Sequence, residues 1–186
     1  MDSHMGFAQH LDVKVERPIG GPGNKADFGG QFKIEHIRDG RVINSFECPN
    51  GIVDVGLNHI LETQFHSGTA ITAWAIGLID NSGYSALAAA DTMSSHTGWG
   101  EATQYTEANR PAWTAGTAAS RAITNAATVD YSMNATKTIK GIFVAGGTGY
   151  NTKSATTGTL WATAAFGSTV SVVNGDTLRV TYTVSG

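Results

Sequence analysis

The sequence is poor in charged residues, which make up 15% of its 186 positions, well below the usual quarter. Lys and Arg number 12 against 15 Asp and Glu, so the formal net charge is −3. Proteins that bind nucleic acid need a basic surface to neutralise phosphates. This balance gives no such surface, and we expect no nucleic-acid partner.

Cysteine and long hydrophobic runs are also scarce. Cys48 is the only cysteine, so an internal disulfide framework is excluded. No run approaches the roughly 18 apolar residues of a membrane span, and we expect no membrane partner. A chain of this length buries a sizeable core without disulfides. We therefore expect one folded domain, with or without an additional arm.

The abundant residues are those of turns and strands: 23 glycines, with many Thr, Ser and Ala. We predict three parts. Residues 1–5 are interpreted as a cloning remnant, residues 6–30 form an irregular N-terminal arm, and residues 31–186 form the folded domain. In the arm, Leu11, Val13 and Val15 alternate with charged residues before a Gly- and Pro-rich stretch that includes Ile19. Two interpretations stay open, a mobile tail or an arm that orders against a neighbouring subunit.

Strand patterns recur along the domain. Residues 177–184 alternate strictly between apolar and polar, which indicates a half-buried strand. Asn174 and Gly175 stand between this run and residues 170–173, a pattern typical of a β-hairpin. Residues 31–38 and 41–48 flank Asp39-Gly40 in the same way and predict another hairpin. Residues 73–79 and 139–145 are apolar on both faces, which predicts central strands.

One helix is expected after residue 52, with its end at Ser67-Gly68. Its apolar residues recur every three or four positions, so they form one stripe that should lie on a sheet or cover a barrel end. They are Val53, Leu57, Ile60, Leu61 and Phe65. The predicted fold is therefore mainly β, an antiparallel β-sandwich or jelly-roll-like domain with one short α-helix and the irregular N-terminal arm. Strands and helices do not alternate, which argues against a parallel α/β sheet.

Residues that carry chemistry are present but not in catalytic patterns. His59 and His66 would lie two helical turns apart, too far to share one ion. Loop carboxylates such as Asp80 and Glu101 show no pairing in sequence, and Ser94-Ser95-His96 lacks a nucleophile elbow. We expect no enzyme activity, no metal and no cofactor.

Three aromatic residues fall in or beside a long polar excursion over residues 91–110: Trp99, Tyr105 and Trp113. Three interpretations are open. These side chains pack the loop onto the sheet, anchor a protein interface, or stack on sugar rings. Together with Leu11, Val13, Val15 and Ile19 of the arm they are the candidate interface residues. Trp74 and Trp161 lie in strand-like runs and are expected in the core.

Several segments resemble a known group of proteins. They are residues 50–58, 73–78, 90–99, 105–111 and 173–181. In this order the chain resembles small virion proteins of tailed bacteriophages and prophages over about residues 30–185. The resemblance implies a structural virion role, first of all that of a capsid cement (decoration) protein on the outer surface of the major capsid protein shell.

The same resemblance implies self-association as a dimer or trimer, a terminal arm that reaches neighbours, and a place on the capsid surface after assembly in the host cytoplasm. An alternative is a tail- or fibre-associated adsorption protein that binds host glycans.

Overall fold

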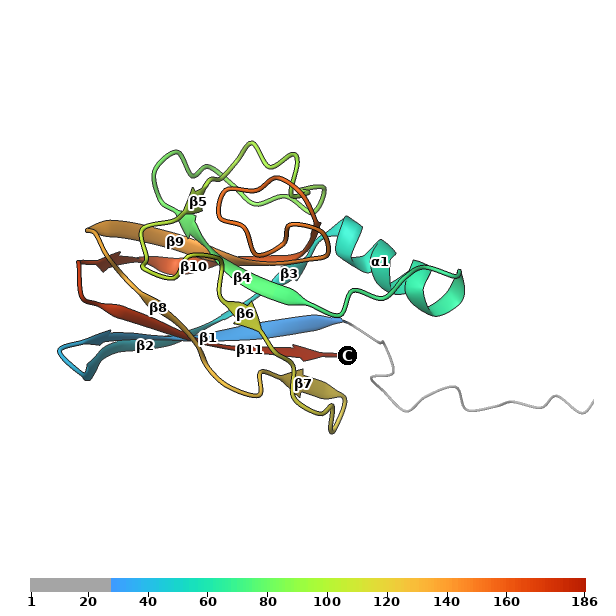
Figure 1. Cartoon of the computed structure of the whole chain (residues 1–186), viewed down its shortest axis with the longest axis horizontal. Helices are drawn as coiled ribbons and strands as arrows, with labels where there is room; N and C mark the ends of the chain where they lie inside the picture. The colour runs from blue at the N-terminus through green and yellow to red at the C-terminus, as the bar shows by residue number, and fades with distance from the viewer. Residues whose placement is uncertain (1–27) are drawn as a thin grey trace, which may run out of the picture.

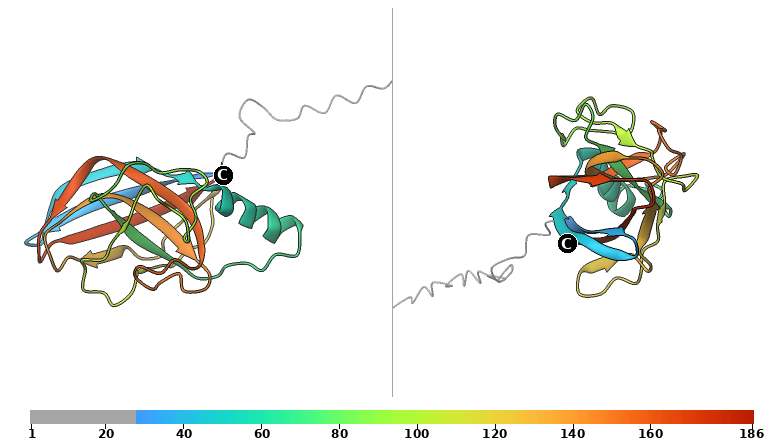
Figure 2. Two further views of the ribbon diagram at one scale, coloured as in Figure 1. Left: turned by 90° about the horizontal axis from the view of Figure 1, so that it is seen from above. Right: turned by 90° about the vertical axis from the view of Figure 1, so that its left-hand side faces the viewer.

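A computed structural model describes residues 28–186 as two antiparallel sheets packed face to face, with one helix at one end (Figures 1 and 2). The first sheet has the order β2-β1-β11-β7, and β8 also pairs with β11. The second has the order β3-β10-β9-β4-β5, and β6 also pairs with β4. The mainly β sandwich with one short helix is therefore confirmed.

The element bounds, in chain order, are β1 Gly29–Arg38, β2 Arg41–Pro49, β3 Gly51–Ile52, α1 Asp54–Phe65, β4 Trp74–Asp80, β5 Glu101–Ala102, β6 Ala112–Trp113, β7 Ala122–Thr124, β8 Val129–Ser132, β9 Lys137–Gly146, β10 Thr159–Val172 and β11 Thr177–Ser185. Most of the predicted arm, residues 6–30, lies outside the described residues. Its last two residues, Gly29 and Gly30, belong to β1, where they pair with Ser185 and Val184.

The first hairpin and the central strands are as predicted. β1 and β2 pair around Asp39 and Gly40, which adopt φ angles of 50° and 73°. Asp-Gly tolerates such left-handed angles, and the resulting turn matches the twist of paired strands. β9 lies between β10 and β4, and β4 is buried at every interior position, as expected for runs that are apolar on both faces.

The predicted C-terminal hairpin is wrong. β10 pairs with β9 and β3, whereas β11 pairs with β1, β7 and β8. The turn at Asn174 and Gly175 therefore carries the chain from one sheet to the other. Asp176, which is buried, fixes this crossing by accepting a hydrogen bond from the Val173 amide at 2.8 Å. Alternation predicts a strand but does not say which strand it pairs with.

The core has two parts. The larger fills the space between the sheets and includes Phe32, Tyr131 and Tyr182. The smaller lies on the outer face of the second sheet, where residues 81–111 cover Phe143 and Leu160. Figure 1 shows this loop region above β9 and β10. The polar excursion over residues 91–110 is thus part of a packed layer, in which Met93 and Trp99 are buried.

Candidate functional site

The candidate interface residues divide into two groups. Leu11, Val13, Val15 and Ile19 lie outside the residues that the structure describes. Trp99, Tyr105 and Trp113 are described, and their exposed fractions are 5%, 1% and 9%. Trp99 and Tyr105 therefore offer no free face to a sugar ring or a partner protein, and their burial supports the interpretation in which they pack the loop onto the sheet.

Trp99 is held by one hydrogen bond and by two neighbouring rings. Its Nε1 donates to Asp91 Oδ2 at 2.9 Å, inside the protein. The His96 ring stacks on it with centroids 3.9 Å apart, and Phe143 contacts it at 5.1 Å. Asp91 also accepts from the Ala88 amide at 2.9 Å. Asp91 Oδ2 and His96 Nδ1, which lies 3.0 Å from the Trp99 carbonyl oxygen, thus serve the packing of the loop.

Arg110 and Glu101 form the polar centre of the loop layer. The guanidinium donates to both Glu101 oxygens at 2.9 Å, and the two side chains are 1% and 6% exposed. Arg110 also donates to the carbonyl oxygens of Tyr150 and Ala155 at 2.8 and 3.0 Å. Arg110 therefore holds its own loop and the loop that carries Tyr150 and Ala155 against the second sheet. Both carboxylate oxygens of Glu101 accept hydrogen bonds from Arg110, so neither is free for acid or base chemistry.

The other candidate chemical groups are also engaged in contacts. Glu62 pairs with His66 at 2.7 Å, while His59 lies edge-on to Trp74. Asp80 forms an ion pair with Lys137. Burial raises the pKa of the Cys48 thiol to about 11, so it stays protonated and unreactive at neutral pH. Over residues 28–186, no three His, Cys, Asp or Glu side chains gather into a group that holds a metal ion.

The helix was predicted correctly, and two members of its apolar stripe are covered, since Val53 is buried and Ile60 packs against the core. The burial predicted for the other three members is wrong. Leu61 and Phe65 are 56% and 82% exposed, and Leu57 is exposed as well. The opposite side faces the sandwich, because Gly56 is the one buried residue of α1. A Cβ atom at Gly56 would come within 2.6 Å of the Trp161 carbonyl oxygen. The absent side chain brings the helix close on that side, and Leu57, Leu61 and Phe65 face solvent.

Figures 1 and 2 show α1 projecting from one end of the sandwich. We call Leu57, Leu61 and Phe65 the helix stripe. Monomeric proteins rarely leave a row of large apolar side chains in water without a binding role. The periodicity that reveals a helix says nothing of whether the apolar face meets the same chain or another one.

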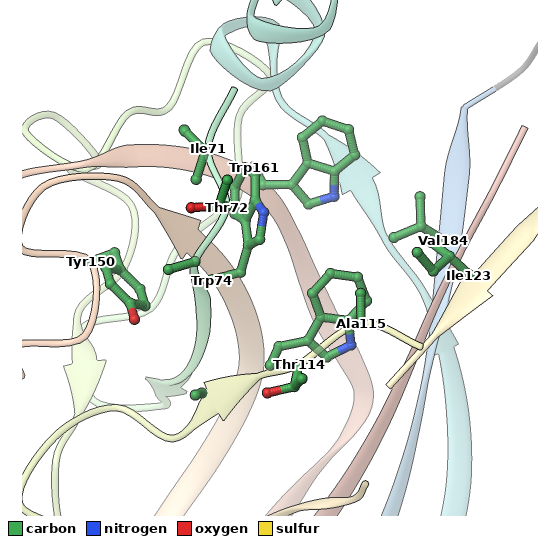
Figure 3. A pocket seen from close by; sticks show the side chains of 12 residues that line it. Ile71, Thr72, Trp74, Thr114, Ala115, Ile123, Tyr150, Trp161 and Val184 are labelled. Carbon is green, nitrogen blue, oxygen red and sulfur yellow. The ribbon is translucent and has the colours of Figure 1, made fainter. Parts of the chain in front are cut away.

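A pocket lies at the same end of the sandwich as α1, between the two sheets. Its volume is about 550 Å³, within the range of pockets that hold ligands or side chains. Trp74, Trp113 and Trp161 line it, together with Tyr150, Ile71 and Val184. Figure 3 shows Trp74 and Trp161 on one side and Val184 on the other. We call it the tryptophan pocket; of the three candidate interface residues that the structure describes, Trp113 alone lines it.

The tryptophan pocket is mostly apolar, and its polar side chains are the hydroxyls of Thr72, Thr114 and Tyr150. Among the described residues that line it, none carries a charge. Trp74 and Trp161 meet edge to face with centroids 5.9 Å apart, and Trp113 lies 5.5 Å from Tyr182. Trp161 Nε1 donates to the Tyr182 hydroxyl at 2.9 Å. Trp113 Nε1 is buried and has no hydrogen-bond partner within the described part of the chain. An unpaired buried donor is costly, so the packing of the Trp113 ring outweighs the loss of one hydrogen bond.

No helix among the described residues is long and apolar enough to cross a membrane. Comparison of the chain with protein-family models and with curated proteins gave no match.

Proposed function

We propose that this chain is a structural protein of the tailed-phage virion, a capsid cement protein that binds the outer surface of the major capsid protein shell and stabilises the head. The observation that carries the proposal is the helix stripe, which presents large apolar side chains at one end of a rigid sandwich. The resemblance to small virion proteins supplies the partner.

The energetics suit a repeated, modest interface. Full burial of one Leu or Phe side chain contributes about 1.5–3 kcal/mol, so three such residues support a weak contact. A shell offers many equivalent sites, and linked contacts raise the total stabilisation without any new kind of interaction. The carboxylates and histidines described above are taken up by structural contacts, which also favours binding over catalysis.

The direct test is co-sedimentation of the full-length protein with empty capsids of its own phage, followed by cryo-EM of the decorated shell. Stoichiometric density over the shell supports the proposal. Density only at a vertex or at the tail, or no density at all, rejects the cement role.

The helix stripe gives a first prediction. The double change Leu61→Ser and Phe65→Ser should weaken capsid binding about tenfold or more, since it removes apolar surface at the contact. The midpoint of urea unfolding should stay unchanged, because both side chains are exposed in the free protein. Binding is measured by co-sedimentation over a range of protein concentrations.

The matched control is Gln64→Ser, an exposed polar position on the same helix. It should bind capsids as the wild type does. Equal binding by the double variant would show that the helix stripe does not meet the shell.

The N-terminal residues give a second prediction. Deletion of residues 5–27 should spare the sandwich, because β1 begins at Gly29, and should weaken capsid binding. The arm adds contacts only where a partner offers strand pairing or apolar burial, since its ordering costs about 1–2 kcal/mol per residue. A truncated protein that decorates capsids as well as the full chain would contradict this role.

A second candidate function is that of a tail- or fibre-associated adsorption protein that binds host glycans. The observation that favours it is the tryptophan pocket, because indole rings stack on sugar faces and several of them converge there. A glycan array probed with the full-length protein tests it. Binding that Trp74→Ala abolishes would support adsorption; an array without signal would leave the cement role as the sole candidate.

A further inference from the structure

The tryptophan pocket favours an apolar occupant over a sugar. Sugars are fixed by hydrogen bonds from carboxylates, amides and other polar groups to several hydroxyls, in addition to stacking. Among the described residues that line this pocket, none is a carboxylate, an amide or a cation. The lining is mostly aromatic and aliphatic, and its polar side chains are the hydroxyls of Thr72, Thr114 and Tyr150. Aliphatic side chains from a peptide segment fit such a lining.

The pocket lies where the N-terminal residues join the sandwich. Gly30 pairs with Val184, which lines the pocket, and Gly29 pairs with Ser185. A Cβ atom at Gly186 would lie 3.2 Å from the Phe28 ring, so Phe28 stays beside the end of β11. Residues 1–27 are therefore joined to the sandwich next to the mouth of the pocket.

The sequence of these residues matches the pocket. Leu11, Val13 and Val15 alternate with Asp12, Lys14 and Glu16. An extended segment with this pattern puts its apolar side chains on one side and its charges on the other. The apolar side can enter the uncharged pocket while the charges stay in water.

The connection is long enough for the segment to return to its own pocket. About nine residues separate Ile19 from Gly29, and they span up to roughly 30 Å when extended. They include Gly20, Gly21 and Gly23, which permit a reversal of the chain. A short tether also raises the effective concentration of the segment at the pocket to about the millimolar range.

We propose that residues 11–19 of the chain dock in extended form into the tryptophan pocket of the same molecule, with their apolar side chains against its aromatic lining. The docked segment covers the tryptophans and completes the open end of the sandwich. This proposal goes beyond the capsid role and does not depend on it, since it concerns the free protein.

Tryptophan fluorescence reads the docking directly, because three of the four tryptophans line the pocket. The test compares acrylamide quenching of the full-length wild type with that of the double variant Val13→Asp and Val15→Asp. Burying a carboxylate among apolar side chains is strongly unfavourable, so the variant should undock and its quenching constant should rise about twofold. The emission maximum should shift to the red. The matched control is Lys14→Ser, on the charged side of the segment, which should quench as the wild type does.

A pocket variant separates docking from other effects. Ile71→Asp should raise quenching by itself, and combining it with the arm changes should give no further rise, since both remove the same contact. Thermal melts followed by circular dichroism should show that the arm variants keep the fold.

Three results would overturn the proposal. The first is equal quenching in the wild type and the arm variant. The second is wild-type quenching that falls as protein concentration rises, which would assign the segment to a second copy. The third is protection of the tryptophans by a neutral oligosaccharide mixture to the same extent in wild type and arm variant, which would assign the pocket to a glycan.

Discussion

Replacing Arg110 with alanine should lower the free energy of unfolding by about 3–5 kcal/mol, the usual cost of leaving one partner of a buried ion pair alone. Glu101 would keep its charge in a site where its side chain is 6% exposed. The carbonyl oxygens of Tyr150 and Ala155 would lose their donor as well. Urea unfolding followed by circular dichroism measures the change. Since a small domain has only about 5–15 kcal/mol to lose, the variant should be close to unfolding at 37 °C.

The control is Arg179→Ala. Arg179 makes a similar two-bonded pair with Asp130, at 2.9 and 2.8 Å, but those side chains are 39% and 38% exposed. Exposed pairs contribute at most about 1 kcal/mol, so this variant should stay nearly as stable as the wild type. If both arginine variants lost the same stability, the loop layer would not depend on its buried pair.

Replacing Asp176 with asparagine should cost about 2–3 kcal/mol at pH 7, because the carboxylate accepts charge-assisted hydrogen bonds. Arg38 donates to both of its oxygens at 2.7 Å, and His36 Nε2 lies 2.8 Å from Oδ2. The asparagine side chain would still offer an oxygen to the Val173 amide but would lose the charge. The crossing from β10 to β11 should loosen, which hydrogen exchange at Val173 and Gly175 would detect.

This effect should depend on pH in a defined direction. The Arg38 guanidinium holds the pKa of Asp176 well below its ordinary value. A carboxyl group with a lowered pKa in the folded state stabilises that state above its unfolded pKa of about 3.9, and the contribution falls as pH drops through the folded pKa. The stability gap between wild type and variant should therefore be full at about pH 5–7 and narrow below about pH 4. A gap that stayed constant down to about pH 2.5 would contradict the assigned role of the charge.

The sequence predicted those features that depend on neighbours in the chain. Asp39-Gly40 revealed a hairpin because the turn geometry itself selects these residues. Residues 139–145 revealed a central strand because burial on both faces removes the polar alternation. The 3.6-residue period revealed α1, because it reports a helix whatever the helix touches.

Features set by distant contacts were missed or mistaken. The strand partner of β11 depends on β1, which lies far away in sequence, so the Asn174-Gly175 turn suggested a hairpin that does not exist. The exposure of Phe65 depends on Gly56 approaching the Trp161 carbonyl, a contact that no local pattern encodes. The tryptophan pocket likewise requires Trp74, Trp113 and Trp161 from three different strands. Asp91 and Arg110 within a Trp-bearing loop were the available signal that this loop is packed.

The pairing of β1 with β11 has a consequence for synthesis on the ribosome. The strands occupy Gly29–Arg38 and Thr177–Ser185, and nine residue pairs join them from Gly29 to Ile37. During synthesis β1 therefore has to wait for β11 before the edge that faces β11 is covered. Because long-range pairing of this kind slows folding and unpaired strand edges associate with other chains, nascent copies of this protein should be most prone to aggregate in the interval before β11 leaves the ribosome. Chaperone demand and the yield of soluble protein should then depend on how fast the residues between β1 and β11 are translated.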